Sequence, residues 1–247
     1  MLVDPCNGNG RVGRPAVFND LDTPYLERLA ALGTPADAID VVFCTHLHND
    51  HCGWNTRLVD GRWVPTFPNA RYVFVDAESA RWDTRSTARH PNDFNVSVFD
   101  ECVLPVVEAG RAEIVSMPHA ISPSLSIEPA TGHTVGHAML VLASGGALAY
   151  FLGDVLHHPC QVFRPELHLP GCDDLAEAIA TRRTLFRRAC DERALVFPAH
   201  FPAPHHGRIE VGGGEEFSFS AGGAASSPDE PGERPPSAAD PGLSVRE

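Results

Sequence analysis

The sequence lacks the features that mark membrane-spanning and secreted proteins. It contains no run of about 18 or more apolar residues, so no transmembrane helix is predicted. The first residues, MLVDPCNGNG, lack the basic and apolar regions of a signal peptide. Seven cysteines are scattered without C-x-x-C pairs, and several lie in apolar segments where a thiol behaves as a small hydrophobe. We therefore expect a cytoplasmic protein without a disulfide framework.

Positive charge is also scarce. The 247 residues include 19 Lys and Arg against 32 Asp and Glu, which gives a net charge of −13. Binding to a polyanion requires clustered cationic side chains that neutralise phosphates. We therefore expect neither a nucleic acid nor a membrane as partner. A hydrophobic content of 43% is ordinary for a globular protein and allows a sizeable core.

Apolar runs alternate with helical patterns along most of the chain, which predicts an α/β protein with mixed sheets. Three neighbouring strand-like segments between Leu125 and Asp154 indicate a meander. Helical patterns are found at residues 25–33, 99–110 and 173–192. Other strands are expected at residues 39–45, 71–76, 112–117 and 194–200. Residues 221–247 are rich in Gly, Pro, Ser and Ala, so we expect a disordered tail.

One short stretch, FCTHLHNDHCGWN at residues 43–55, carries four candidate metal ligands directly behind an apolar run. His46 and His48 are two residues apart, so in an extended segment both side chains leave the same face. These two imidazoles can hold one ion, while the next pair, Asp50 and His51, serves another. Imidazole and carboxylate are ligands that zinc, iron, manganese and cobalt share.

Three further candidate ligands follow strand-like runs. His133 lies in TGHTVGH, Asp154 in FLGDVLHH and His200 in VFPAH. A single residue of this kind is more often a surface or capping residue. Their combination with the first cluster favours metal binding.

The order of these motifs, H-x-H-x-D-H, then G-H-T-x-G-H, then a strand-end G-D and a strand-end His, resembles the metallo-β-lactamase superfamily of binuclear metal hydrolases. Within it, GDVLHHPCQ and AHFPAPHHGRIEVGGGEEFSF are most similar to the methyl parathion hydrolase branch, with quorum-quenching lactonases as more distant relatives. The resemblance implies an αββα sandwich of two mixed sheets flanked by helices.

The segment LVDPC resembles a strand that several further strands precede in relatives. We therefore expect a hydrolase domain at residues 1–220 that is short at its N-terminus and lacks some N-terminal strands. The sheet edge left open would need covering by a partner chain, which a homodimer would provide.

The resemblance also implies the roles of individual residues. One metal is bound by His46, His48 and His133, the other by Asp50, His51 and His200, with Asp154 bridging both. Asp50 would also orient a metal-bridging hydroxide that attacks a lactone or ester carbonyl, with a phosphotriester as a further substrate. His157 is a candidate electrophilic donor, and His137 an outer residue that orients ligands. The two divalent ions are expected to be Zn²⁺, with Mn, Fe or Co as alternatives.

Other interpretations remain open at this point. A thioesterase of the hydroxyacylglutathione hydrolase type uses the same ligands, but no basic cluster lies close to the motifs. A flavin-linked di-iron oxidoreductase is less favoured, because that branch places a Glu where His48 stands. A non-catalytic metal-binding remnant that acts through a partner is the third alternative. Trp54, Trp63 and Phe67 could line an apolar pocket or belong to the core.

Overall fold

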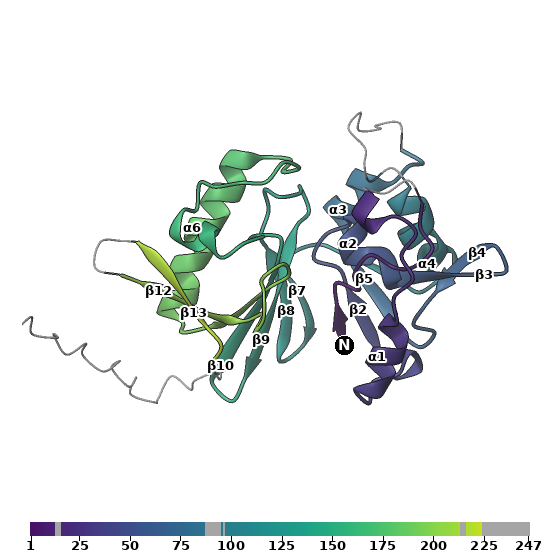
Figure 1. The fold of residues 1–247 in the computed structure, drawn as a ribbon, viewed down its shortest axis with the longest axis horizontal. Coiled ribbons are helices and arrows are strands. Elements are labelled where there is room, and N and C mark those ends of the chain that lie inside the picture. Colours follow the sequence, from purple (N-terminus) through teal and green to yellow (C-terminus); the bar gives the residue numbers. More distant parts are fainter. Residues whose placement is uncertain (13–15, 87–94, 96, 213–215, 224–247) are drawn as a thin grey trace, which may run out of the picture.

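The computed structural model describes residues 1–12, 16–86, 95, 97–212 and 216–223. Two β-sheets pack face to face, and helices cover the outer face of each (Figure 1). Helices α1, α3 and α4 lie on one side of the molecule, and α6 lies on the other. This order of layers confirms the predicted αββα sandwich.

The first sheet has four parallel strands in the order β1-β2-β5-β6. Its strands are β1 (Leu2–Val3), β2 (Val41–Phe43), β5 (Arg71–Val75) and β6 (Ala112–Val115). The outer helices are α1 (Tyr25–Ala31), α3 (Asp76–Trp82), α4 (Leu104–Glu108) and the π-helical turn η4 (Phe99–Val103). The two central strands, β2 and β5, are almost entirely apolar because both faces of the sheet are covered there.

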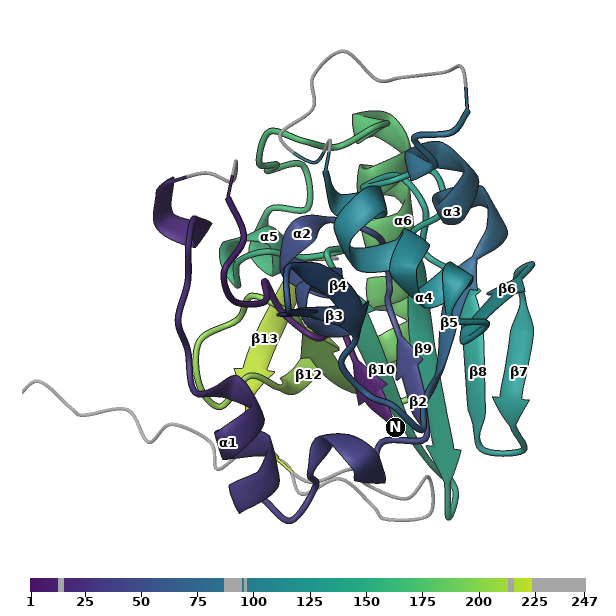
Figure 2. The ribbon, with the colours of Figure 1, turned by 90° about the vertical axis from the view of Figure 1, so that its right-hand side faces the viewer.

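The second sheet has seven strands in the order β13-β12-β11-β10-β9-β8-β7, and only β10 and β11 pair in parallel. Its strands are β7 (His119–Ser122), β8 (Leu125–Pro129), β9 (Ala138–Ser144), β10 (Ala147–Gly153), β11 (Leu195–Pro198), β12 (Gly207–Val211) and β13 (Phe217–Ala221). Helix α6 (Leu175–Asp191) packs on its outer face (Figure 2).

Side-chain alternation along the strands builds the core between the sheets. In β5, Tyr72 and Phe74 point to the outer helices, whereas Val73 and Val75 point to the second sheet. The second sheet contributes Ile127 and other apolar side chains to the same layer. The period of two residues in a strand therefore lets one apolar run serve two cores.

The remaining elements are short and lie in connections. They are η1 (Ala16–Phe18), η2 (Ala36–Ala38), α2 (Asn49–Cys52), η3 (Gly53–Asn55), the hairpin β3 (Thr56–Val59) and β4 (Arg62–Pro65), and α5 (Cys160–Phe163). Helix α2 lies immediately behind β2 and contains half of the first motif.

The predicted long elements are confirmed, with ends that differ by a few residues. The meander corresponds to β8, β9 and β10, and the long helix to α6. Strand β1 forms one edge of the first sheet. Ala221 ends β13, and the remainder of the predicted tail, residues 224–247, lies outside the described residues. Within the described part of the chain, no helix combines the length and apolarity needed to cross a membrane.

Candidate metal centre

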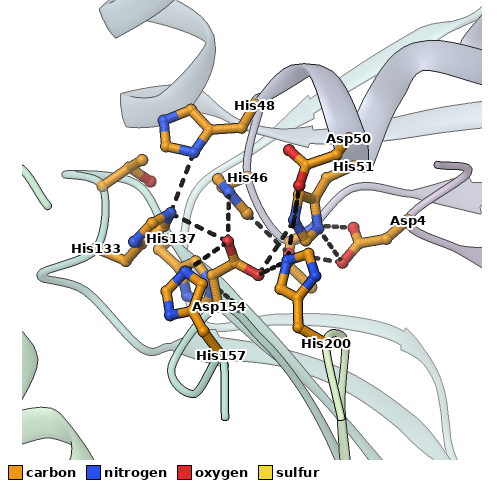
Figure 3. A network of polar contacts seen from close by, with 12 residues as sticks. Asp4, His46, His48, Asp50, His51, His133, His137, Asp154, His157 and His200 are labelled. Carbon is orange, nitrogen blue, oxygen red and sulfur yellow. Dashed lines mark hydrogen bonds and ion pairs between the residues drawn. The ribbon is translucent and has the colours of Figure 1, made fainter. Parts of the chain in front are cut away.

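The seven predicted ligands converge at one edge of the sandwich, although they are far apart in the sequence (Figure 3). The first motif follows the carboxyl end of β2, and His133 lies in the loop between β8 and β9. Asp154 follows β10, and His200 follows β11. Parallel strands place their carboxyl ends at the same edge, so the fold itself gathers these polar residues.

The first donor group consists of His46, His48, His133 and Asp154. The Nε2 atom of His133 lies 3.1 Å from His48 Nδ1 and 3.3 Å from Asp154 Oδ2. His46 Nε2 lies 3.6 Å from the same carboxylate oxygen. All four side chains are buried. Three ring nitrogens and one carboxylate oxygen therefore face a common point.

The second donor group consists of Asp50, His51 and His200. The other oxygen of Asp154, Oδ1, lies 3.1 Å from His51 Nε2 and 3.0 Å from His200 Nε2. Asp50 Oδ2 lies 3.7 and 3.6 Å from the same two nitrogens. The carboxylate of Asp154 thus lies between the two groups and directs one oxygen toward each (Figure 3).

Buried donor atoms without partners test whether these residues suit a cation. His46 Nε2, His51 Nε2 and Asp154 Oδ1 are buried and form no hydrogen bond of good geometry with a described residue, although the last two atoms lie 3.1 Å apart. Burial of a polar atom without a partner costs about 1–3 kcal/mol. Three such atoms at one point are explained if lone pairs there bind metal, and histidine and carboxylate are suitable ligands for divalent ions. The residues present therefore fit a metal centre.

The pKa values of the histidines and of Asp154 are shifted by burial and by one another. Burial lowers the pKa of His46 and His48 well below the usual range, which keeps both rings neutral. Burial would raise the pKa of Asp154, but the surrounding histidines outweigh it and hold the carboxyl well below its usual range. Burial opposes protonation of His51 as well, yet Asp154, Asp4 and Asp50 raise its pKa well above normal. Burial alone thus disfavours a protonated ring, whereas the carboxylates of Asp4, Asp50 and Asp154 favour positive charge beside them.

A protein-family model matches the part of the chain that carries these residues. Residues 17–200 match the metallo-β-lactamase superfamily model. The chain belongs to the metallo-β-lactamase superfamily. Members of this superfamily use divalent metals, and this chain is one of its metal-dependent hydrolases.

Solved structures share the fold over most of the chain. A crystal structure of hydrolase AbOPH in the β-lactamase superfamily is 25% identical with a TM-score of 0.74, covering 85% of this chain and 74% of that chain. The dizinc quorum-quenching lactonase AidC is 22% identical with a TM-score of 0.71, covering 91% and 76%. A probable metal-dependent hydrolase from Staphylococcus aureus is 16% identical with a TM-score of 0.71, covering 90% and 79%. A search of the curated proteins found no match.

Asp4 orients His51 in this metallo-β-lactamase fold, and the sequence analysis missed it. One carboxylate oxygen accepts hydrogen bonds from the Thr45 backbone N–H at 2.7 Å, and the other from the Thr45 hydroxyl at 2.8 Å. The second oxygen also lies 3.0 Å from His51 Nδ1. A proton on Nδ1 leaves the lone pair of Nε2 free to face the centre. The signal in the sequence was an acidic residue directly behind the short apolar run of β1.

The loop of the second motif is held by close backbone packing. A Cβ atom on Gly136 would lie 2.3 Å from the backbone nitrogen of Glu78, and one on Gly132 would lie 2.2 Å from that of Ala178. The two glycines therefore allow the loop to press against α3 and α6. His137 is not among the donors and accepts a hydrogen bond from the Asp154 backbone N–H at 3.0 Å. Burial lowers the pKa of His137 to about 3, so the ring remains a neutral acceptor.

A cavity of about 410 Å³ is lined in part by the candidate metal ligands. His157 lines it, and its Nε2 atom lies 3.1 Å from Asp154 Oδ2. Its apolar wall consists of Phe18, Leu169 and Pro170, which the sequence analysis did not identify.

The three aromatic residues considered for this pocket do not line it. Phe67 is fully buried in the core under the outer helices, and Trp54 stacks on Tyr25. Trp63 lies beneath the guanidinium of Arg11. These residues therefore serve packing, in agreement with the second of the two interpretations.

Proposed function

We propose that this chain is a two-metal hydrolase that cleaves esters or lactones. The observation that carries the proposal is the position of Asp154, whose two carboxylate oxygens face different donor groups at 3.0–3.3 Å. A carboxylate placed in this way suits a bridge between two ions. Asp50, His51 and His200 would hold one ion, and His46, His48 and His133 the other.

Divalent ions held there would supply the Lewis acidity that activates water and polarises the scissile carbonyl. The carboxylate of Asp50 faces the cavity and can accept the proton that the attacking water loses. As the water oxygen bonds to the carbonyl carbon, the C–O bond of the alcohol portion breaks. The alkoxide that leaves needs a proton, and Asp50 can return the one it accepted. His157 can donate a hydrogen bond to the oxygen that gains charge.

The cavity favours an uncharged substrate with an apolar portion. Its described lining includes Phe18, Leu169 and Pro170 but no Arg, and the sequence contains no Lys. A carboxylate or phosphate group on the substrate would therefore find no Arg or Lys side chain among these residues. Two structures with this fold, AidC and an N-acyl homoserine lactone hydrolase, are lactonases by name. An ester or lactone is our first choice, and a neutral phosphotriester is the second.

The described lining also disfavours a thioesterase of the hydroxyacylglutathione hydrolase type. Such an enzyme must hold an anionic thiol carrier, for which a cationic patch near the donors would be needed. The non-catalytic alternative is disfavoured because Asp50 and His157, which the proposed chemistry requires, both line the cavity. Zinc is the metal that we propose, because it suits imidazole and carboxylate ligands.

Elemental analysis together with hydrolysis rates tests the proposal. We expect about two metal ions per chain, as a two-metal hydrolase requires, and turnover of aryl esters and lactones that a chelator abolishes and zinc restores. The panel should include a thioester and a phosphotriester. Metal-free protein that retains full turnover would refute the mechanism, and loaded protein without turnover on the whole panel would support the non-catalytic alternative.

A further inference from the structure

Glu78 is a buried acidic residue outside both donor groups. It lies in α3, and only 1% of its surface is exposed. A buried carboxylate is costly unless hydrogen bonds compensate for lost hydration. Glu78 receives four hydrogen bonds, two on each oxygen.

Three of the four donors come from the two segments that carry His48 and His133. Oε1 accepts from the Leu47 backbone N–H at 2.9 Å, and Leu47 lies between His46 and His48. Oε2 accepts from the Thr134 hydroxyl at 2.7 Å and from the Gly136 backbone N–H at 3.1 Å. The first donor loop follows the first sheet, and the second belongs to the second sheet. One carboxylate therefore joins the two loops across the sandwich.

The fourth donor extends the contact to His48 itself. The indole N–H of Trp82 donates to Glu78 Oε1 at 2.7 Å, one turn later in α3. The Trp82 ring lies edge-on against His48, with ring centroids 5.4 Å apart. Glu78 thus fixes the backbone before His48 and also the aromatic ring against which His48 packs.

Only an ionised carboxylate satisfies all four donors. Three of the four are N–H groups, which cannot accept a hydrogen bond, and they are distributed over both oxygens. A glutamine amide would point its NH₂ group at one or two of them. The less costly orientation directs NH₂ toward Thr134, whose hydroxyl can reverse, and leaves the Gly136 N–H without an acceptor.

We propose that Glu78 is a positioning residue that sets the distance between His48 and His133, and thereby the affinity for one of the two ions. This rests on the proposed function, because it takes those histidines as ligands. The pair lies 3.1 Å apart, nitrogen to nitrogen, and a change in either loop would alter this separation. The Asp50, His51 and His200 group has no hydrogen bond to Glu78 among the described residues, so the second ion should be affected far less.

Stepwise metal binding to the full-length protein tests this inference. The two dissociation constants for Zn²⁺ would be measured by competition with a chromophoric chelator, beside the melting temperature of the metal-free protein. Outer-shell partners typically contribute about 10- to 100-fold to metal affinity. We expect Glu78→Gln to lower the affinity for the ion assigned to His46, His48 and His133 by that factor. The affinity for the other ion should be unchanged.

The matched control is Glu128→Gln. Glu128 is a partly buried carboxylate in β8 that pairs with Arg188 on α6, away from the donors. The Glu128→Gln variant should have a changed melting temperature and two unchanged dissociation constants for Zn²⁺. Thr134→Val removes one hydrogen-bond donor to Glu78 and should cause a smaller loss of affinity for the same ion. This variant keeps the test valid if Glu78→Gln fails to fold.

The outcomes separate this inference from the proposed function. Wild-type protein that binds two ions, together with a Glu78→Gln variant of unchanged affinities, would refute the role of Glu78 alone. An equal loss of affinity for both ions would show a general structural role of Glu78 and would also refute the proposed positioning role. Wild-type protein that binds no zinc would refute both proposals.

Discussion

Replacement of Asp4 by Asn should disable His51 through a change of tautomer. The Thr45 backbone N–H needs an acceptor, so the amide oxygen of Asn must take the place of Oδ1. The NH₂ group then faces the Thr45 hydroxyl, which can reverse, and His51 Nδ1. Nδ1 must become the acceptor, and the ring proton moves to Nε2. That atom faces Asp154 Oδ1 at 3.1 Å, so it would donate to the carboxylate instead of binding an ion.

The expected loss is about 10- to 100-fold in affinity for one ion, or about 1.4–2.7 kcal/mol at 1.36 kcal/mol per factor of ten. The affected ion is the one assigned to Asp50, His51 and His200, whereas Glu78→Gln should affect the other. Stepwise zinc titration and turnover at saturating zinc would be measured together.

A matched control is Asp100→Asn, because Asp100 also accepts a hydrogen bond from a threonine hydroxyl but is exposed and remote from the centre. It should behave as wild type in both assays. If Asp4→Asn retained both wild-type affinities and wild-type turnover, the assignment of the ring proton to Nδ1, and with it the role of Asp4, would be wrong.

Three further changes address other parts of the site. Asp50→Ala should reduce turnover at saturating zinc by at least about 100-fold, more than it reduces metal content; full metal with near-normal turnover on every substrate would contradict its role. His157→Ala should lower kcat about 100-fold at unchanged metal content, with exposed His158→Ala as control. Arg182→Met removes a buried donor to the Val155 and Pro165 carbonyls; urea unfolding should show a loss of about 1–3 kcal/mol per carbonyl, and KM should rise.

The positions of the candidate ligands at strand ends were predictable from the sequence, because a position relative to a strand is a local property. His46 and His48 follow an apolar run, as do Asp154 and His200, so strand prediction alone placed them at strand ends. The grouping into two sets came from the family resemblance, and the distances between donors agree with it. The long helix α6 was predictable for a similar reason, since its pattern extends over 17 residues.

Residues that orient the donors were not predictable because their partners are remote in the sequence. Asp4 is 47 positions from His51, and Glu78 is 56 from Thr134. A single carboxylate on a short helix has the pattern of a solvated surface residue, and nothing local reveals its burial. The apolar wall was missed likewise, because Leu169 reaches the cavity through a loop whose path depends on Arg182 and Gln161. The prediction of missing N-terminal strands stays a prediction.

Each group of candidate ligands contains residues that follow strands of both sheets, so metal binding should increase the stability of the fold. His46 and His48 follow the first sheet and share their group with His133 and Asp154 from the second; the other group has the same division. An ion bound in either group therefore fastens one sheet to the other. A ligand that binds only the folded state at 100 times its dissociation constant stabilises that state by about 2.7 kcal/mol. Metal loading should therefore resist separation of the two layers, and the carboxylates of Asp4 and Glu78 fix the loops through which this linkage acts.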